Sequence, residues 1–169
     1  MEIKRVRKDE FTVIGKLGTT AEGENFVNAL WKKANEGFEE ISSLVKRDAQ
    51  GVPVGFWGLR SSLDTPLDEW KDGEGSYLAG LEVKDGSMAP MGWTKWVVPE
   101  SLYLSVCVDG SIEAAVREVE KYIKKNQLIL KGAYHEYMNV FLPGQLLLFF
   151  PVKEKSIHIL SNEGPVTQK

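Results

Sequence analysis

Cysteine and histidine are scarce in this chain. Cys107 is the only cysteine, and His135 and His158 are the only histidines. A single cysteine excludes an intramolecular disulfide and a metal site built from several cysteines. Two histidines are too few for a typical zinc site, and His158 lies in a polar stretch. We therefore expect no cysteine–histidine nucleophile, no metal and no cofactor.

Long apolar runs and a basic excess are also missing, and we expect no secretory signal peptide. The longest apolar run covers residues 145–152, which is too short to span a bilayer. Residues 1–5 carry charged side chains where a signal peptide would need an apolar stretch. The net charge is −3, whereas a nucleic-acid-binding surface usually shows as a basic bias. We therefore predict a cytoplasmic protein with no membrane partner and no direct nucleic-acid binding.

Loops of the kind that bind phosphate or calcium are missing as well. Gly73 and Gly75 precede an expected strand, whereas a phosphate-binding loop precedes a helix. The acidic residues Asp64, Asp68 and Asp72 lack the spacing of a calcium loop, so we interpret them as solvated charges.

Aromatic residues are the feature that the chain has in some excess. Its 169 residues, 43% of them hydrophobic, fit one globular domain, and five are tryptophans at positions 31, 57, 70, 93 and 96. Such residues either pack in the core or line a ligand pocket, and composition alone leaves both readings open.

Alternating and helical periodicity predict the order of the elements. The expected elements are an extended segment over 2–17, a helix over 24–46, strands over 54–60 and 77–84, an extended segment over 93–108 bent at Pro99, a helix over 112–126, and strands over 133–142 and 145–152. Residues 153–169 are expected to be a polar tail that follows one domain over 1–152.

The two halves of this order match. Each is a strand, a helix and two strands, so the pattern predicts pseudo-repeats over about 2–84 and 93–152. Two such units can join into one curved antiparallel sheet, with both helices on one face. The predicted fold class is therefore α+β, and the seam between the halves is the natural place for a ligand.

At this point the chain resembles the GyrI-like small-molecule-binding domains, which also occur as effector-binding domains of AraC-type and MerR-type multidrug regulators. The resemblance covers about residues 2–152. It is carried by the segments 55–59 (GFWGL), 77–83 (YLAGLEV), 98–103 (VPESLY), 109–112 (DGSI), 135–137 (HEY) and 150–152 (FPV).

The chain departs from the family pattern at several points. His135 replaces the usual aromatic residue before the glutamate, and Asp109 stands where the family often has histidine. No helix-turn-helix segment is recognised, so the chain resembles a stand-alone member. The inserted loop 61–75 means that no ligand identity is carried over.

Two glutamates are the leading candidates for the site. Glu136 falls in an expected strand among large apolar neighbours, where a carboxylate is costly unless it is paired or used, although a Glu at a sheet edge would reach water. The resemblance implies that Glu136 is the glutamate that meets cationic ligands. Glu82 lies beside Gly80, which leaves room for a ligand or for a neighbouring backbone, but it also fits a solvent-facing position.

Aromatic side chains complete the predicted pocket. A carboxylate with two or three aromatic faces suits flat cations, and it also suits flat neutral aromatics. For each ring, core packing is the competing interpretation. The candidate ligand-binding residues are Glu136, Glu82, Trp57, Tyr77, Trp93, Tyr103, Tyr137 and Phe150.

Three functions follow as alternatives. The first is binding of small amphipathic aromatic compounds, cationic ones included, for sensing or sequestration. The second, implied by the resemblance, is hydrolysis of cyclopropane-containing genotoxins, with Glu136 or Glu82 as the base and Tyr103 or Tyr137 as the acid. The third is a protein partner, either DNA gyrase, which the protein would inhibit, or a separate regulator.

Overall fold

A computed structural model describes residues 1–138 and 144–155. The end of the strand predicted over 133–142, most of the predicted tail 153–169, and His158 lie outside the described residues. Within them, no helix combines the length and the apolar character that crossing a membrane requires.

Nine strands, two α-helices and two 3₁₀ helices make up the described chain. In order they are β1 (Ile3–Lys8), β2 (Phe11–Thr19), η1 (Thr20–Glu22), α1 (Phe26–Gly37), η2 (Phe38–Leu44), β3 (Phe56–Ser61), β4 (Ser76–Val83), β5 (Thr94–Val98), β6 (Ser101–Cys107), α2 (Ile112–Lys125), β7 (Leu128–Leu130), β8 (His135–Met138) and β9 (Leu146–Glu154).

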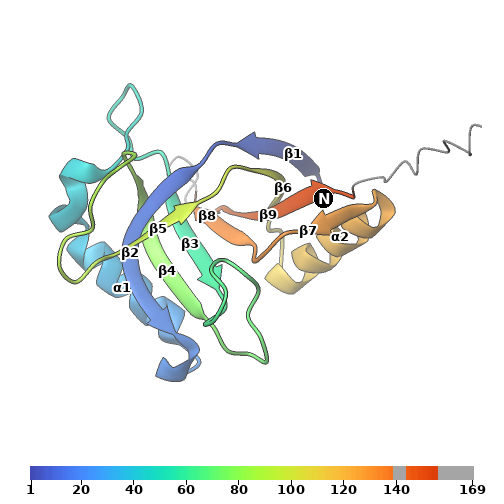
Figure 1. Cartoon of the computed structure of the whole chain (residues 1–169), viewed down its shortest axis with the longest axis horizontal. Coiled ribbons are helices and arrows are strands. Elements are labelled where there is room, and N and C mark those ends of the chain that lie inside the picture. The colour runs from blue at the N-terminus through green and yellow to red at the C-terminus, as the bar shows by residue number, and fades with distance from the viewer. Residues whose placement is uncertain (139–143, 156–169) are drawn as a thin grey trace, which may run out of the picture.

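All nine strands join one antiparallel sheet whose order reveals the duplication. The order is β1-β6-β9-β8-β3-β4-β2-β5, with β7 paired to β9. Read from either end of the sheet, the equivalent strands of the two units follow one another in the same order. A pseudo-twofold axis therefore passes between β8 and β3 (Figure 1). The first strand of each unit crosses over: β1 extends the edge of the second unit and β5 extends the edge of the first.

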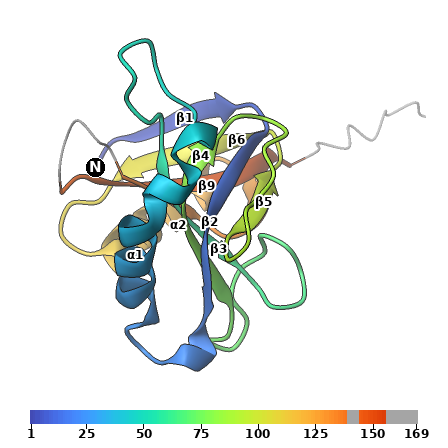
Figure 2. The same cartoon turned by 90° about the vertical axis from the view of Figure 1, so that its left-hand side faces the viewer.

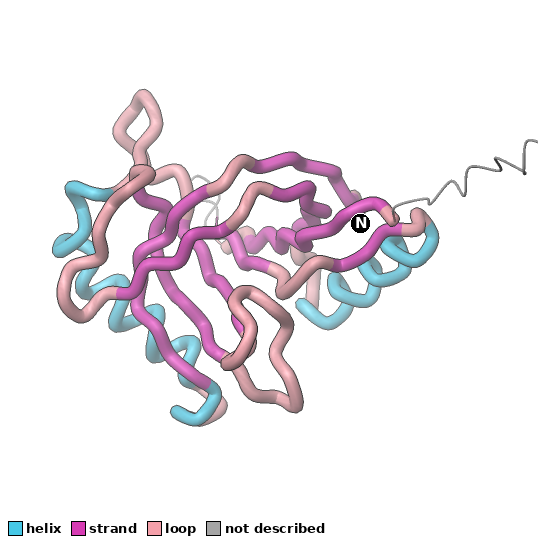
Figure 3. Tube along the Cα trace, viewed as in Figure 1, coloured by secondary structure: helices cyan, strands magenta, loops and turns pink. Residues whose placement is uncertain are grey.

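Both helices cover the same face of this curved sheet. On α1 the buried residues Phe26, Leu30 and Ala34 pack against Tyr77 and Ala79 of β4. The second helix buries its own apolar side chains against β6 and β9. Figure 2 views α1 in front of the sheet, and Figure 3 shows in cyan that α1 and α2 lie towards opposite ends of the sheet. The predicted α+β class and the placement of both helices are confirmed.

Element boundaries differ from the prediction where local contacts intervene. The helix predicted over 24–46 is α-helical only to Gly37 and continues as the 3₁₀ helix η2. Glycine weakens a helix, and this one packs under the ring of Trp93. Thr19 and Glu22 form a capping box at the start of the short 3₁₀ helix η1. The three-residue strand β7 was not predicted, because so short a run carries no periodicity.

Two facing glycines let β2 and β4 approach closely. Gly15 lies opposite Gly80 in the register. A Cβ added to Gly80 would lie 2.5 Å from the carbonyl oxygen of Ile14 and 2.9 Å from the Cα of Gly15. The space beside Gly80 is therefore taken by the neighbouring backbone, which is one of the two explanations that the sequence left open.

We predict that Gly80→Ala lowers the free energy of unfolding by about 2 kcal/mol, because the added methyl group overlaps backbone atoms that cannot move aside. Urea unfolding at neutral pH measures the change. Gly18→Ala is the matched control on β2, since its Cβ would meet only side-chain atoms at 3.0 Å or more. Equal stability of the two variants would contradict the packing argument.

Candidate functional site

The sheet register places the two candidate glutamates on opposite faces. Glu136 lies opposite Gly58, and Trp57 lies opposite both Tyr137 and Gly80. Because side chains alternate along a strand, Glu136 points to the helix-covered face while Glu82 points to the other. The two carboxylates therefore do not share one pocket floor.

On the helix-covered face, Glu136 is buried and held by two side chains. Its exposed fraction is 8%. Arg60 of β3 donates from Nη2 to Oε1 over 2.8 Å, and the hydroxyl of Tyr77 donates to Oε2 over 2.9 Å. The same hydroxyl accepts from the indole Nε1 of Trp31 over 2.9 Å. Burial, and then the charge of Glu136, raises the pKa of Tyr77 far above its usual value, so this phenol is a neutral donor.

Aromatic rings surround the Arg60 guanidinium. Its Cζ lies 4.6 Å from the ring centre of Trp70, 4.9 Å from that of Tyr134 and 5.7 Å from that of Tyr77. Within the described residues, its Nε is buried without a hydrogen-bond partner. We call this group the Glu136 cage; it comprises Trp31, Arg60, Trp70, Tyr77, Tyr134 and Glu136.

Small residues in the strands make the cage geometrically feasible. A Cβ at Gly58 would overlap the hydroxyl of Tyr77, so only glycine lets that hydroxyl reach the carboxylate. Likewise, a Cβ at Gly75 would overlap the ring of Trp70, whose indole nitrogen donates to the backbone of Ser76. The sequence predicted only Glu136 and Tyr77 of this group. Arg60 would have been found from its place opposite Tyr77, had the strand register been known.

A surface hollow of about 490 Å³ adjoins the cage. Arg60 and Trp70 of the cage line it together with Glu24, Phe26 and Val27. A small molecule in this hollow would therefore touch the cage from the solvent side.

On the opposite face, Glu82 lies at the base of an open cleft of about 520 Å³. We call it the Glu82 cleft; it is lined by Val6, Arg7, Lys8, Lys46, Val54, Trp57, Glu82, Tyr137 and Phe149. The carboxylate is 3% exposed and accepts from Nε1 of Trp57 over 3.1 Å. Predicted site residues Glu82, Trp57 and Tyr137 thus come together here, apart from Glu136.

Tyr103 borders a third cavity on this face, with His135. The hollow measures about 310 Å³, and the two rings lie 5.8 Å apart. His135 is 2% exposed, and its Nδ1 has no partner in the part of the chain that the structure describes. Burial lowers the pKa of His135 to about 4 and raises that of Tyr103 to about 12, so both rings are neutral at pH 7.

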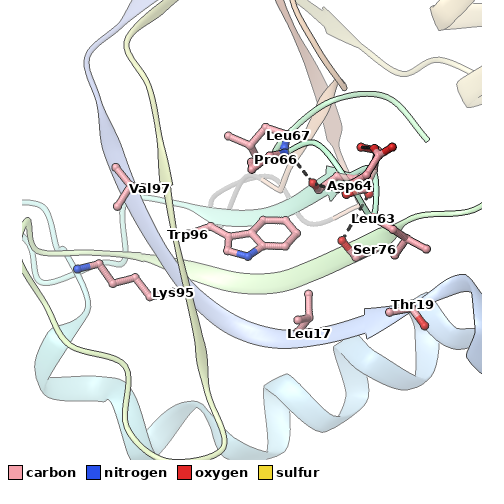
Figure 4. Close-up of a pocket in the computed structure, with 12 residues that line it drawn as sticks. Leu17, Thr19, Leu63, Asp64, Pro66, Leu67, Ser76, Lys95, Trp96 and Val97 are labelled. Carbon is pink, nitrogen blue, oxygen red and sulfur yellow. Dashed lines mark hydrogen bonds between the residues drawn. The ribbon is translucent and has the colours of Figure 1, made fainter. Parts of the chain in front are cut away.

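A fourth hollow lies towards the β2–β5 edge. Figure 4 shows Trp96 of β5 between Leu17 of β2 and Leu67 of the loop that follows β3. Its charged lining residues, Asp64 and Lys95, are not buried. This hollow therefore offers apolar contact without a desolvated charge.

The remaining predicted residues, Trp93 and Phe150, lie in packed clusters of the core. Trp93 stacks on Phe38 and donates to Glu40 over 2.6 Å. Phe150 packs in the cluster beneath α2 and against Tyr134.

The pairs suggested for hydrolysis are placed differently. Glu136 and Tyr103 project from opposite faces of the sheet, so they cannot act on the same atom. Glu82 and Tyr137 both line the Glu82 cleft. Among the described residues, no group of three or more His, Cys, Asp or Glu is placed to hold a metal ion.

Solved structures share this fold. The C-terminal domain of EcmrR superimposes with a TM-score of 0.66 at 13% identity, covering 90% of this chain and 98% of that domain. In the EcmrR–DNA complex, the match spans 57% of the EcmrR chain. SAV2435, in a structure bound to tetraphenylphosphonium, matches with a TM-score of 0.63 at 18% identity, covering 90% and 94% of the two chains.

A more distant match is a hydrolase from Listeria innocua, with a TM-score of 0.54 at 14% identity, covering 90% and 92% of the two chains. No protein-family model matches the sequence, and no curated protein is significantly similar to it. Identities this low show the fold alone, which is the fold of the EcmrR C-terminal domain and of SAV2435.

We predict that His135 makes the protein sensitive to acid. The folded-state pKa of about 4 lies below the ordinary value of 6.5, so the unfolded chain binds the proton more readily. The contribution of neutral His135 to the free energy of unfolding is complete above about pH 7. Up to roughly 3 kcal/mol of this contribution is lost as the pH falls from 6.5 to 4. Urea unfolding across this range compares the wild type with His135→Phe, which keeps a ring but cannot titrate. Identical pH slopes would contradict the assignment.

Proposed function

We propose that this protein binds hydrophobic, aromatic organic cations at the Glu136 cage. The observation that supports this most directly is that the cage already holds a cation: the Arg60 guanidinium lies among aromatic rings and is paired with a buried carboxylate. Arg60 shows which chemistry the site accepts, because a planar positive group there gains both Coulomb attraction and cation–π contact.

A ligand must displace Arg60 to use the same carboxylate. The side chain of Arg60 is 19% exposed, so it can swing outwards without crossing the core. The adjoining hollow includes Glu24, which gives a displaced guanidinium a carboxylate at the surface. The exchange then replaces one buried ion pair with another, and no unpaired charge is left buried.

Hydrogen bonds hold the aromatic rings of the cage in place. Tyr77 and Trp31 are linked by a hydrogen bond, and Trp70 is fixed to the backbone by its own. Rings that are held in place lose little conformational freedom on binding. A neighbour of the same fold, SAV2435, has been solved with tetraphenylphosphonium, an aromatic cation, which supports the proposal by analogy.

We expect tetraphenylphosphonium to quench the fluorescence of Trp31 and Trp70, and Glu136→Gln to weaken its binding by tenfold or more, about 1.4 kcal/mol at the least. The mutation leaves Arg60 as an uncompensated positive charge in the cage. Fluorescence titration, with a thermal melt to check folding, measures the affinity. Triphenylphosphine oxide, which is neutral, should be insensitive to the mutation.

The variant Arg60→Met should act in the opposite direction and tighten cation binding, because the internal competitor is gone. Arg117→Met, at an exposed site on α2, is the matched control. Unchanged cation affinity in both Glu136→Gln and Arg60→Met would exclude the cage as the binding site.

A further inference from the structure

The Glu82 cleft differs from the Glu136 cage in its charge balance. Two ammonium groups share its one buried carboxylate: Nζ of Lys8 lies 3.2 Å from Oε1, and Nζ of Lys46 lies 3.7 Å from Oε2. Arg7 also lines the cleft and is paired with Glu100 outside it, at 3.6 Å. One carboxylate compensates one ammonium, so the cleft keeps an excess of positive charge.

Glu82 positions the two lysines but does not occupy all of their hydrogen-bond donors. An ammonium group has three donors. Lys8 lies with Nζ 4.4 Å from the ring centre of Phe11, which fixes its direction, and its side chain is 26% exposed. Lys46 is 51% exposed and makes only a long contact. Both can therefore donate to an anion that enters the cleft.

The aromatic wall beside these lysines is rigid. Trp57 lies 4.8 Å from Tyr137 and 5.3 Å from Phe149, measured between ring centres. The hydroxyl of Tyr137 donates to the backbone oxygen of Val54 over 3.0 Å, and Trp57 is fixed by Glu82. Tyr137 and Phe149 remain partly exposed, so a flat ring can lie against them.

We propose that the Glu82 cleft binds an aromatic anion, such as an aromatic carboxylate. Its ring would lie against Tyr137 and Phe149, and its carboxylate would accept from Lys46 and Lys8. Glu82 is then a positioning residue that holds the two ammonium groups at the mouth of an apolar cleft. The proposal is independent of cation binding at Glu136, because it concerns the other face and the opposite charge.

Isothermal titration calorimetry with three naphthalene probes tests the charge preference. They are 2-naphthoate, 2-naphthylmethanol and 2-naphthylmethylammonium, which share the ring and differ in charge. We expect 2-naphthoate to bind most tightly and its affinity to fall with added salt, since the charges are near the surface. Equal affinity for the three probes, or a preference for the ammonium, would overturn the proposal.

Point mutations test whether 2-naphthoate binds in the Glu82 cleft. Lys46→Gln should weaken 2-naphthoate binding about fivefold, as expected for an exposed charge pair. Lys95→Gln, which alters a lysine beside Trp96, should leave it unchanged. Glu82→Gln, where it folds, should tighten 2-naphthoate binding because both ammonium groups are released. An unaltered affinity in Lys46→Gln would overturn the assignment to this cleft.

Two cross-checks separate this proposal from cation binding at the cage. Glu136→Gln should not change 2-naphthoate affinity, and Lys46→Gln should not change tetraphenylphosphonium affinity. Loss of 2-naphthoate binding in Glu136→Gln would place the anion on the wrong face and overturn the proposal.

Discussion

The antiparallel pairing of β3 with β8 is the constraint on which the rest of the structure depends. It joins the two pseudo-repeats, and its register sets Gly58 opposite Glu136 and Trp57 opposite Tyr137. Because the side-chain period of a strand is two, a shift by one residue would move Glu136 and Tyr137 to each other's face. Glu136 would then lose Arg60 and Tyr77, and Tyr137 would leave the Glu82 cleft. One short pairing thus determines the chemistry of both faces.

A second constraint is that a buried carboxylate must be compensated. Among the described residues two glutamates are buried, Glu82 and Glu136, and each is paired with an internal cation that also contacts aromatic rings. The two sites differ in how rigidly the compensating cation is held. Arg60 has a planar guanidinium enclosed by rings, whereas Lys8 and Lys46 are flexible point charges at an open cleft. The number of cations differs as well, since one guanidinium balances Glu136 whereas two ammonium groups share Glu82, so the first site is neutral and the second is positive.

Much of the fold could be predicted from the sequence, because alternation over 77–83 and helical spacing over 112–125 are strong local signals. Burial of Glu136 was one of the two readings that the sequence left open, and the structure supports it. The pairing of Glu136 with Arg60 could not be predicted, because the two residues are 76 positions apart and only the strand register brings them together. The expectation that both glutamates meet in one seam assumed a register that the sequence does not encode locally. Trp70 was missed for a similar reason, since it reaches the cage from a loop.

The tethered cation at Glu136 also bears on which ligands the cage would select. Arg60 is covalently held beside its carboxylate, so its effective concentration there is far above that of any free ion. A small cation of equal charge therefore cannot compete, since it gains nothing that Arg60 lacks. A ligand succeeds only when further contacts offset this advantage, and the adjoining hollow supplies apolar surface from Phe26, Val27 and Trp70. At about 25 cal/mol per Å² of buried apolar area, a ligand with several aromatic rings gains what a lone ammonium does not. In the proposed function, the internal cation would thereby convert a general affinity for positive charge into selectivity for large, hydrophobic cations.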